Sequence, residues 1–245
     1  RRRQDHLCQT PFLRTGGGTQ EFEMTARFLE KPRTWIAAGC VFTFLLLLLS
    51  PYDLAISQHL AQIDSGLGQF IRRYGTMPFI PLYLLCLTIL SFSSLRTRFP
   101  ALSLSASAMI VQALGHTWIL TSLIKHIWGR TRFYNLAPDY SDYMSIFDFD
   151  SGGAGVSFTS GHVATALVTL PTVMVLARMN HVQAAWIVLA CNVASGFFMA
   201  YCRILAGAHY ATDVLGSMAL ACFFVPLSVY LGERYLKLFD KKNTL

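Results

Sequence analysis

The chain has 245 residues, of which 53% are hydrophobic and 13% are charged, whereas about a quarter of the residues of a soluble domain are charged. This composition excludes a soluble globular enzyme, a disordered chain and a coiled coil. Lys and Arg outnumber Asp and Glu by 20 to 13, which gives a formal net charge of +7. In so apolar a chain, this basic balance indicates anionic lipid rather than nucleic acid as a partner.

Six stretches of at least 18 residues contain no Asp, Glu, Lys or Arg. They cover residues 34–52, 74–95, 99–124, 151–177, 179–202 and 214–232. A helix needs about 20 apolar residues to cross a bilayer, and backbone groups in lipid must be hydrogen-bonded within their own segment. We therefore predict an all-α polytopic membrane protein with six transmembrane helices. The alternative, core helices of a large soluble protein, is disfavoured because every stretch is long enough to span.

Basic residues in the loops predict the orientation of the chain. With six spans, both termini lie on one side, which carries fourteen Lys and Arg against six on the other. The positive-inside rule places both termini in the cytoplasm and the first, third and fifth loops outside. These three loops would face the periplasm if the cell has one. The first apolar run lacks a small-residue cleavage site, so we expect no cleaved signal peptide.

The regions outside the spans are short. Residues 1–33 are predicted to form a flexible basic cytoplasmic tail that either contacts anionic headgroups or is solvated. Residues 34–232 are predicted to form the six-helix domain, and residues 233–245 a basic cytoplasmic C-terminal tail. In the first loop, about residues 53–73, apolar residues recur at helical spacing. This pattern predicts one interfacial helix with a stripe of Ile56, Leu60, Ile63, Leu67 and Phe70.

Three polar clusters map to the outward side. The first holds Lys125, Arg130 and Arg132 at the end of the third span. It is consistent either with snorkelling anchors or with an anion site. Arg130 could bind a second phosphate or serve as an anchor.

The second cluster is Thr159-Ser160-Gly161-His162, where the fourth span begins. Ser and Thr are preferred N-caps, and the free N–H groups of a first helical turn bind anions. Gly161 would let a ligand approach the backbone. The alternative is a capped helix with an interfacial histidine.

The third cluster is Arg203-x5-His209-x3-Asp213. On a helix, His209 and Asp213 share one face, so the carboxylate could accept the Nδ1–H and leave Nε2 free as a nucleophile. A purely structural His–Asp pair is the alternative. The three clusters together supply a nucleophile, a second imidazole and several cations, which phosphoryl transfer requires.

The clusters resemble the signature of the type 2 phosphatidic acid phosphatase family. That pattern runs Lys-x6-Arg-Pro, then Pro-Ser-Gly-His, then Ser-Arg-x5-His-x3-Asp. The chain departs from it at three positions, where Phe133 and Thr159 replace prolines and Cys202 replaces a serine. None of the three would do chemistry, and Thr159 could still help to cap the helix.

The resemblance implies a role for each matching residue. His209 attacks phosphorus to form a phosphohistidine, Asp213 orients it, and His162 acts as acid and then as base. The phosphate would be held by Lys125, Arg132, Ser160, Gly161 and Arg203. Because these groups neutralise the phosphate, we expect neither a metal nor another cofactor.

The resemblance therefore implies a metal-independent lipid phosphatase whose substrate is a membrane lipid and which has no nucleic-acid partner. The compact six-span chain and the outward site indicate a bacterial protein. We expect it to be a multi-pass protein of the cytoplasmic (inner) membrane, with its active site at the periplasmic face. Lipid A is the first candidate substrate, with phosphatidylglycerophosphate, undecaprenyl diphosphate and phosphatidic acid as alternatives. A lipid phosphotransferase is a further alternative, and an anion transporter is the alternative from another class. Residues 137–158 are expected to form a loop beside the site that contacts a headgroup, binds a divalent ion or is solvated. His116 is expected to be a packing histidine.

Overall fold

The computed structural model describes residues 28–150 and 155–242, and these residues are all-α, with no strand among them. Most of the predicted N-terminal tail, residues 1–27, lies outside the described part. The elements in chain order are α2 (Pro32–Leu49), η1 (Ser50–Tyr52), α3 (Asp53–Leu60), α4 (Gly66–Tyr74), α5 (Phe79–Ser91), α6 (Ser93–Arg98), α7 (Pro100–Val111), η2 (Gln112–Leu120), α8 (Thr121–Trp128), η3 (Phe133–Asn135), α9 (Gly161–Ala166), α10 (Leu170–Arg178), α11 (Val182–Leu205) and α12 (Ala211–Lys242).

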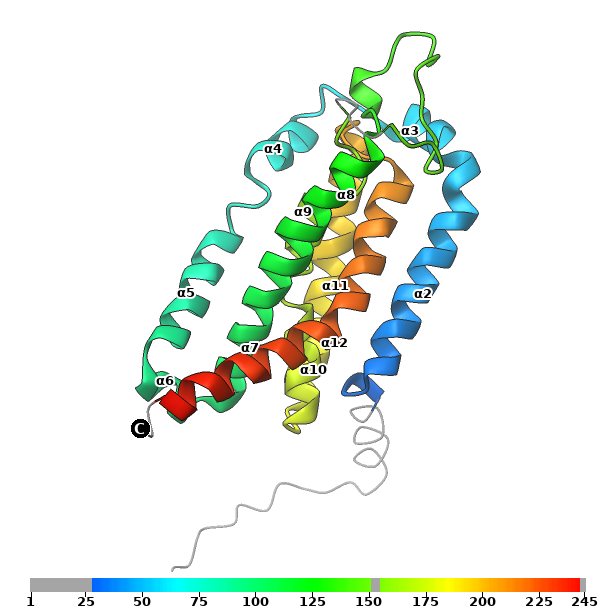
Figure 1. Ribbon diagram of the computed structural model, residues 1–245. Coiled ribbons are helices and arrows are strands. Elements are labelled where there is room, and N and C mark those ends of the chain that lie inside the picture. Colours follow the sequence, from blue (N-terminus) through cyan, green and yellow to red (C-terminus); the bar gives the residue numbers. More distant parts are fainter. Residues whose placement is uncertain (1–27, 151–154, 243–245) are drawn as a thin grey trace, which may run out of the picture.

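Six helical stretches of the described chain are long and apolar enough to cross a membrane, as predicted. They are Pro32–Leu60, Gly66–Ser91, Pro100–Asn135, Gly161–Arg178, Val182–Leu205 and Ala211–Leu238. Figure 1 shows them as a bundle. We call the end that carries α3 and α4, at the top of Figure 1, the site end.

The fourth and sixth spans form the centre of the bundle. The most apolar window is 67% buried in Gly161–Arg178 and 61% buried in Ala211–Leu238, against 22% to 44% in the other four. α12 packs on α2 and α7, and α10 packs on α11 and α7. The outer spans expose large apolar side chains such as Phe44, Leu84 and Ile119. An exterior of this kind is expected where lipid covers the protein.

The first loop does not form the single interfacial helix that the spacing of its apolar residues predicted. It forms α3 and α4, separated by residues 61–65. The N–H of Gln62 donates to the carbonyl of Leu205 over 2.7 Å. Ser65 then begins α4 as its N-cap, and its hydroxyl accepts from the N–H of Gly68. A tertiary hydrogen bond and a new N-cap therefore divide the helix, although the spacing of the apolar residues in the sequence continues across residues 61–65.

α12 is a 32-residue helix with Pro226 inside it. A proline in a helix interior removes one backbone hydrogen bond and bends the helix. Figure 1 shows the last part of α12 turned across the end of the bundle opposite to the site end. Residues 233–242, predicted as part of the C-terminal tail, are thus helical.

The third span changes helical type at its middle, where Gln112–Leu120 forms a π-helix. The side chain of Gln112 donates to the carbonyl of Ala221 over 3.3 Å and accepts from the hydroxyl of Ser228 over 2.7 Å. These two bonds join the third span to the sixth. His116 is completely buried beside them, as expected for a packing histidine.

Candidate active site

The three motif segments meet at the site end. Lys125 lies in α8, and its ammonium donates to the carbonyl of Val156 over 2.5 Å. Four residues further along, the N–H of Ser160 donates to the carbonyl of Asp213 over 3.3 Å. The first motif is therefore hydrogen-bonded to the segment that carries the second, and the second is hydrogen-bonded to the third.

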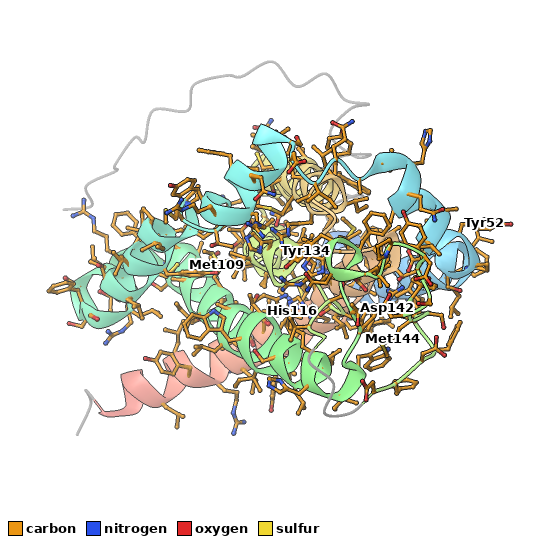
Figure 2. The ribbon with its side chains drawn as sticks, turned by 90° about the horizontal axis from the view of Figure 1, so that it is seen from above. Tyr52, Met109, His116, Tyr134, Asp142 and Met144 are labelled. Atoms are coloured by element: carbon orange, nitrogen blue, oxygen red, sulfur yellow. The ribbon has the colours of Figure 1, made fainter. Side chains whose placement is uncertain are left out.

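Two glycines form the turns that bring these segments together. Gly129 ends α8 with a φ of +60°, and Gly207 follows α11 with a φ of +62°. Residues with a side chain rarely adopt this left-handed conformation. The carbonyl of Gly207 accepts from the N–H of Tyr134 over 3.1 Å. Figure 2, which looks down on the site end, shows Tyr134 near the middle of the bundle and Tyr52 at its edge.

His209 is buried in the turn between α11 and α12, with an exposed fraction of 2%. Its Nδ1 lies 3.5 Å from Oδ2 of Asp213, a longer separation than a normal hydrogen bond. Burial lowers the pKa of His209 to about 3; the charges of Lys125 and Arg203 act in the same direction and Asp213 opposes them. The imidazole is therefore neutral at pH 7, which a nitrogen nucleophile requires.

Asp213 is completely buried in the first turn of α12. Its Oδ1 accepts from Nη1 of Arg130 over 2.7 Å. Its Oδ2 accepts from the hydroxyl of Ser157 and from the N–H of Tyr210, the latter over 2.9 Å. The bond from the N–H of Tyr210 is one of the two bonds of a capping box. The carboxylate that faces His209 therefore also stabilises the first turn of α12.

The structure places Arg130 in a different setting from the two that the sequence left open, a second phosphate site and an anchor at the interface. Its side chain is completely buried, and its guanidinium lies 4.0 Å from the ring centre of Tyr210. It bonds two carboxylates, because Nη2 donates to Asp53 over 2.8 Å and Nη1 donates to Asp213. Nε donates to the carbonyl of Met144 over 3.0 Å. The guanidinium is thus occupied by groups of the protein.

The three cations that are predicted to bind phosphate have few hydrogen-bond acceptors within the protein. Arg203 is 2% exposed, and within the described residues its Nε and Nη1 have no hydrogen-bond partner. Nη1 of Arg132 donates to the hydroxyl of Tyr134 over 2.6 Å, while its Nε finds no acceptor in the described part of the chain. No ion pair of Lys125, Arg132 or Arg203 with a carboxylate occurs among residues 28–150 and 155–242. A buried cation without an ion-pair partner is costly, so Arg203, together with the partly buried Lys125 and Arg132, fits an anionic ligand.

A fourth cation that the sequence did not identify lies beside them. The guanidinium carbon of Arg72, in α4, lies 5.9 Å from the ring centre of Tyr134, and that of Arg132 lies 5.7 Å from the same ring. Arg203 is within electrostatic reach of both arginines. The sequence contains a signal for Arg72, since it belongs to the outward basic residues, but nothing distinguishes it from Arg73 there.

The second motif is placed as expected but does not cap its helix. Ser160 is buried at the N-cap position of α9, and its side chain makes no capping bond to the described backbone. The hydroxyl of Thr159 likewise has no partner within the described residues, so its predicted capping role is wrong. A Cβ on Gly161 would meet only Thr121, at 4.0 Å. The space beside this glycine is therefore open to a ligand.

His162 lies one residue into α9 and is partly buried. It is within electrostatic reach of Lys125, Arg132 and Arg203. Because Lys125 and Arg203 also act electrostatically on His209, both imidazoles are within reach of the same two cations. The structure thus gathers both histidines, Asp213 and the predicted phosphate-binding residues at one end of the bundle.

The acidic loop that precedes the second motif is held by local turns. Asp139 accepts from Ser141, Asp142 from the N–H of Ala137, and Asp148 from the N–H of Ser145. Across the described residues, no three His, Cys, Asp or Glu side chains are grouped to hold a metal ion. The loop contacts the site instead through Tyr143, whose hydroxyl accepts from Nη2 of Arg130 over 3.4 Å.

Comparison with known proteins places the chain in the family that its motifs resemble. The family model of the PAP2 superfamily matches residues 100–236, more than half of the chain. A lipid A 1-phosphatase from Rhizobium etli is 27% identical over 184 residues, which cover 69% of this chain and 71% of that protein. No solved structure matches the chain significantly. The chain therefore belongs to the PAP2 superfamily, the group of phosphatases that its three motifs resemble.

Proposed function

We propose that this protein hydrolyses a phosphate monoester, or the terminal phosphate of a diphosphate, of a membrane lipid through a phosphohistidine intermediate. The observation that carries the proposal is the buried guanidinium of Arg203, whose Nε and Nη1 lack acceptors among the described residues, next to the buried pair of His209 and Asp213. A phosphoryl group would supply those acceptors. Membership of the superfamily and the likeness to a lipid A 1-phosphatase support a lipid phosphatase.

In the first step, Nε2 of His209 attacks phosphorus in line with the leaving oxygen. The P–N bond forms as the P–O bond breaks, and protonated His162 gives its proton to the leaving oxygen. The lipid departs as an alcohol from a monoester and as a monophosphate from a diphosphate. The imidazole of His209 becomes positively charged, and Asp213 stabilises that charge. Lys125, Arg132 and Arg203 hold the charge on the other phosphoryl oxygens, with Ser160 and Gly161 beside them.

In the second step, water attacks the phosphohistidine. His162, now neutral, takes a proton from the water as its oxygen bonds to phosphorus, and the P–N bond breaks. Inorganic phosphate leaves, and His209 returns to its neutral form. The bond electrons return to Nε2, so no proton has to leave that nitrogen. Because fixed cations neutralise the phosphate, we propose that the reaction needs no metal ion.

The lipid chains would reach the site from the side of the bundle. A groove of about 670 Å³ lies where α4 and the start of α5 face α11, and it is lined by apolar residues such as Phe70, Ile71, Phe198 and Met199. Arg203 follows Met199 by one helical turn. Met199 and Arg203 therefore share one face of α11, so a lipid with its chains in the groove could place its headgroup at the proposed phosphate site.

We propose lipid A as the first substrate to test, because the Rhizobium relative carries that name. Phosphatidylglycerophosphate and undecaprenyl diphosphate are the next candidates. The bacterial relative supports a position in the bacterial inner membrane. The excess of basic residues at the opposite side supports cytoplasmic termini, with the site end facing the periplasm.

The test is phosphate release by the full-length protein in detergent containing EDTA, measured on a panel of these lipids. Wild-type protein should release phosphate from at least one of them, and His209→Ala and His162→Ala should reduce release to background. His59→Ala is the matched control, because His59 is exposed on α3 and should leave turnover unchanged. Turnover by His209→Ala would remove the nucleophile assignment, and loss of wild-type activity in EDTA would contradict the metal-free reaction. Transfer of labelled phosphate to a lipid acceptor instead of water would indicate a phosphotransferase.

A further inference from the structure

We propose that Asp53 and Arg130 are positioning residues for the nucleophile. Together with Asp213 they form a buried group of two carboxylates joined by one guanidinium, which we call the brace (Asp53, Arg130 and Asp213). The brace fixes Asp213 toward His209 and places one net negative charge behind the imidazole. This inference rests on the proposed role of His209 as the nucleophile.

The brace is closed and fully buried. Arg130 lies between the two carboxylates, 2.8 Å from Asp53 and 2.7 Å from Asp213, and all three side chains have an exposed fraction of 0%. Thr212 joins its parts, because its N–H donates to Oδ1 of Asp53 over 3.0 Å and its hydroxyl donates to Oδ2 of the same residue. The hydroxyl oxygen of Thr212 also accepts from Nη1 of Arg130 over 2.8 Å. Every charged member is therefore hydrogen-bonded on more than one side.

These bonds decide which oxygen of Asp213 faces the imidazole. Arg130 occupies Oδ1, while Ser157 and the N–H of Tyr210 hold Oδ2 from the other side. With both oxygens held, the carboxylate cannot rotate, and Oδ2 remains the atom that lies 3.5 Å from Nδ1 of His209. When the imidazole becomes charged, the distance between Nδ1 and Oδ2 can shorten slightly, so that the two atoms form a hydrogen bond.

The charge of the brace matches the reaction. Two carboxylates and one guanidinium sum to one negative charge, and the attack on phosphorus would place one positive charge on His209. Without Asp53, Arg130 and Asp213 would form a neutral pair, and no net charge would oppose the new cation. Screening is weak in a buried site. The difference of one negative charge should therefore change the energy of the charged His209 imidazole strongly and that of the neutral imidazole weakly.

Asp53 comes from a part of the chain that the superfamily match does not include. It is the first residue of α3, in the last part of the first helical stretch Pro32–Leu60, whereas the match begins at residue 100. The first span therefore delivers a side chain to the support of the nucleophile. An ionised aspartate at this depth would be costly without such a partner.

The experiment compares Asp53→Asn with Asp64→Asn in the full-length protein in detergent. Asp64 is exposed between α3 and α4 and provides the same substitution outside the brace. We measure kcat, KM and inhibition by vanadate and by inorganic phosphate. Vanadate imitates the five-coordinate phosphorus of the transition state, whereas phosphate imitates the bound ground state.

Asp53→Asn should lower kcat about 10- to 100-fold, the loss seen in metal sites when a residue that orients a metal-ligating side chain by hydrogen bonding is removed. The vanadate inhibition constant should rise in parallel, while KM and the phosphate inhibition constant stay within about twofold, because only the transition state contains the charged imidazole. Asp64→Asn should match the wild type. A folded Asp53→Asn with wild-type kcat would overturn the brace, and so would an equal loss in all four quantities, which indicates damage to the whole site.

Thr212→Val decides the question if Asp53→Asn does not fold. This nearly isosteric change removes the hydroxyl between Asp53 and Arg130 and should lower kcat in the same direction with KM unchanged; wild-type kcat would overturn the proposal. His209→Gln separates the two hypotheses. If it still releases phosphate, the proposed nucleophile is wrong; if it is inactive while Asp53→Asn behaves as wild type, only the brace is wrong.

Discussion

Nη1 of Arg130 lies 2.7 Å from Oδ1 of Asp213, and both side chains are completely buried. A buried ion pair adds little to stability compared with a well-packed apolar pair, but removing one partner leaves the other charged and unpaired. Here the guanidinium also holds Asp53, so its removal would leave two carboxylates in the interior.

Arg130→Gln should therefore destabilise the protein by about 3–5 kcal/mol, the cost of breaking a buried pair. The measurement is reversible unfolding of the protein in mixed micelles. Arg178→Gln is the matched control, because Arg178 pairs with Glu233 over 2.8 Å and both side chains are about one-third exposed. An exposed pair contributes about 1 kcal/mol or less. Equal losses in the two variants would contradict the buried role of Arg130.

His162→Ala should affect the two chemical steps differently. If His162 protonates the leaving oxygen, a substrate with a good leaving group, such as p-nitrophenyl phosphate, needs that proton less. Rapid-mixing measurements should then show a burst of p-nitrophenol close to that of the wild type, followed by slow turnover, because the phosphohistidine still needs a base for its hydrolysis. Loss of the burst together with the turnover would argue against this assignment.

Arg72 should contribute to substrate binding, whereas Arg73 should not. Both are exposed in α4, but Arg72 is near the ring of Tyr134 and Arg203, and Arg73 is near Tyr74. Arg72→Gln should raise KM for a phospholipid about 3- to 10-fold, the loss expected for roughly 1 kcal/mol of charge interaction. Arg73→Gln should stay close to the wild type in the same assay. The same change in KM for both variants would mean that general surface charge is responsible.

His209 should not titrate in the folded protein between pH 8 and pH 5. Its pKa is lowered from 6.5 to about 3 by burial, so the imidazole stays neutral over this range. Nitrogen NMR of histidine-labelled protein, with the His209 signals assigned by their loss in His209→Gln, measures this directly. A midpoint near 6.5 in the folded state would contradict the burial.

The same shift predicts how stability depends on pH. The unfolded chain takes up the proton of His209 near pH 6.5, but the folded chain does so only near pH 3. The contribution of His209 to stability is therefore fully present above pH 6.5 and declines as the pH falls toward 3, by about 1.4 kcal/mol per pH unit. The wild type should lose more stability than His209→Gln between pH 7 and pH 5. Parallel losses in the two proteins would contradict this prediction.

Phe198→Gln should weaken the use of long-chain lipids only. Phe198 is 50% exposed and lines the groove between α4 and α11, whereas the neighbouring Phe197, 53% exposed, lines a different cavity beside α2. The polar side chain should raise KM for a lipid with long chains several-fold and leave p-nitrophenyl phosphate unaffected, because that substrate has no chain to place. Phe197→Gln is the control. Equal effects on both substrates would exclude the groove as the place of the chains.

The spans and the motifs were predictable because their signals are local. The absence of charge over about 20 residues is read directly from the sequence, and the superfamily motifs have fixed spacing. The contact between Asp53 and Arg130 joins residues 77 positions apart, and no periodicity encodes such a pair. A usable signal was present, because an aspartate directly after an apolar span is expensive unless it is paired.

The differences in secondary structure have similar causes. The apolar spacing of the first loop ignores the hydrogen bond from Gln62 to Leu205, which separates α3 from α4. In α12, the change from apolar to charged residues shows where the hydrophobic part of the helix ends. Helix formation does not require apolar side chains, so the helix itself continues to Lys242. The capping role expected for Thr159 failed because Ser160 occupies the N-cap position of α9, one residue later, and the buried Thr159 hydroxyl has no partner among the described residues.

The position of Asp53 also bears on whether the first two spans can be replaced by those of a related protein. Since this residue begins α3, it travels with the first span and not with the segment that carries the motifs. A chimaera that joins the first two spans of one relative to the last four of another would keep every signature residue and still lose the partner of Arg130, unless the donor provides an acid at the same depth. Compatibility in such hybrids should therefore follow the residue at position 53 rather than overall sequence identity.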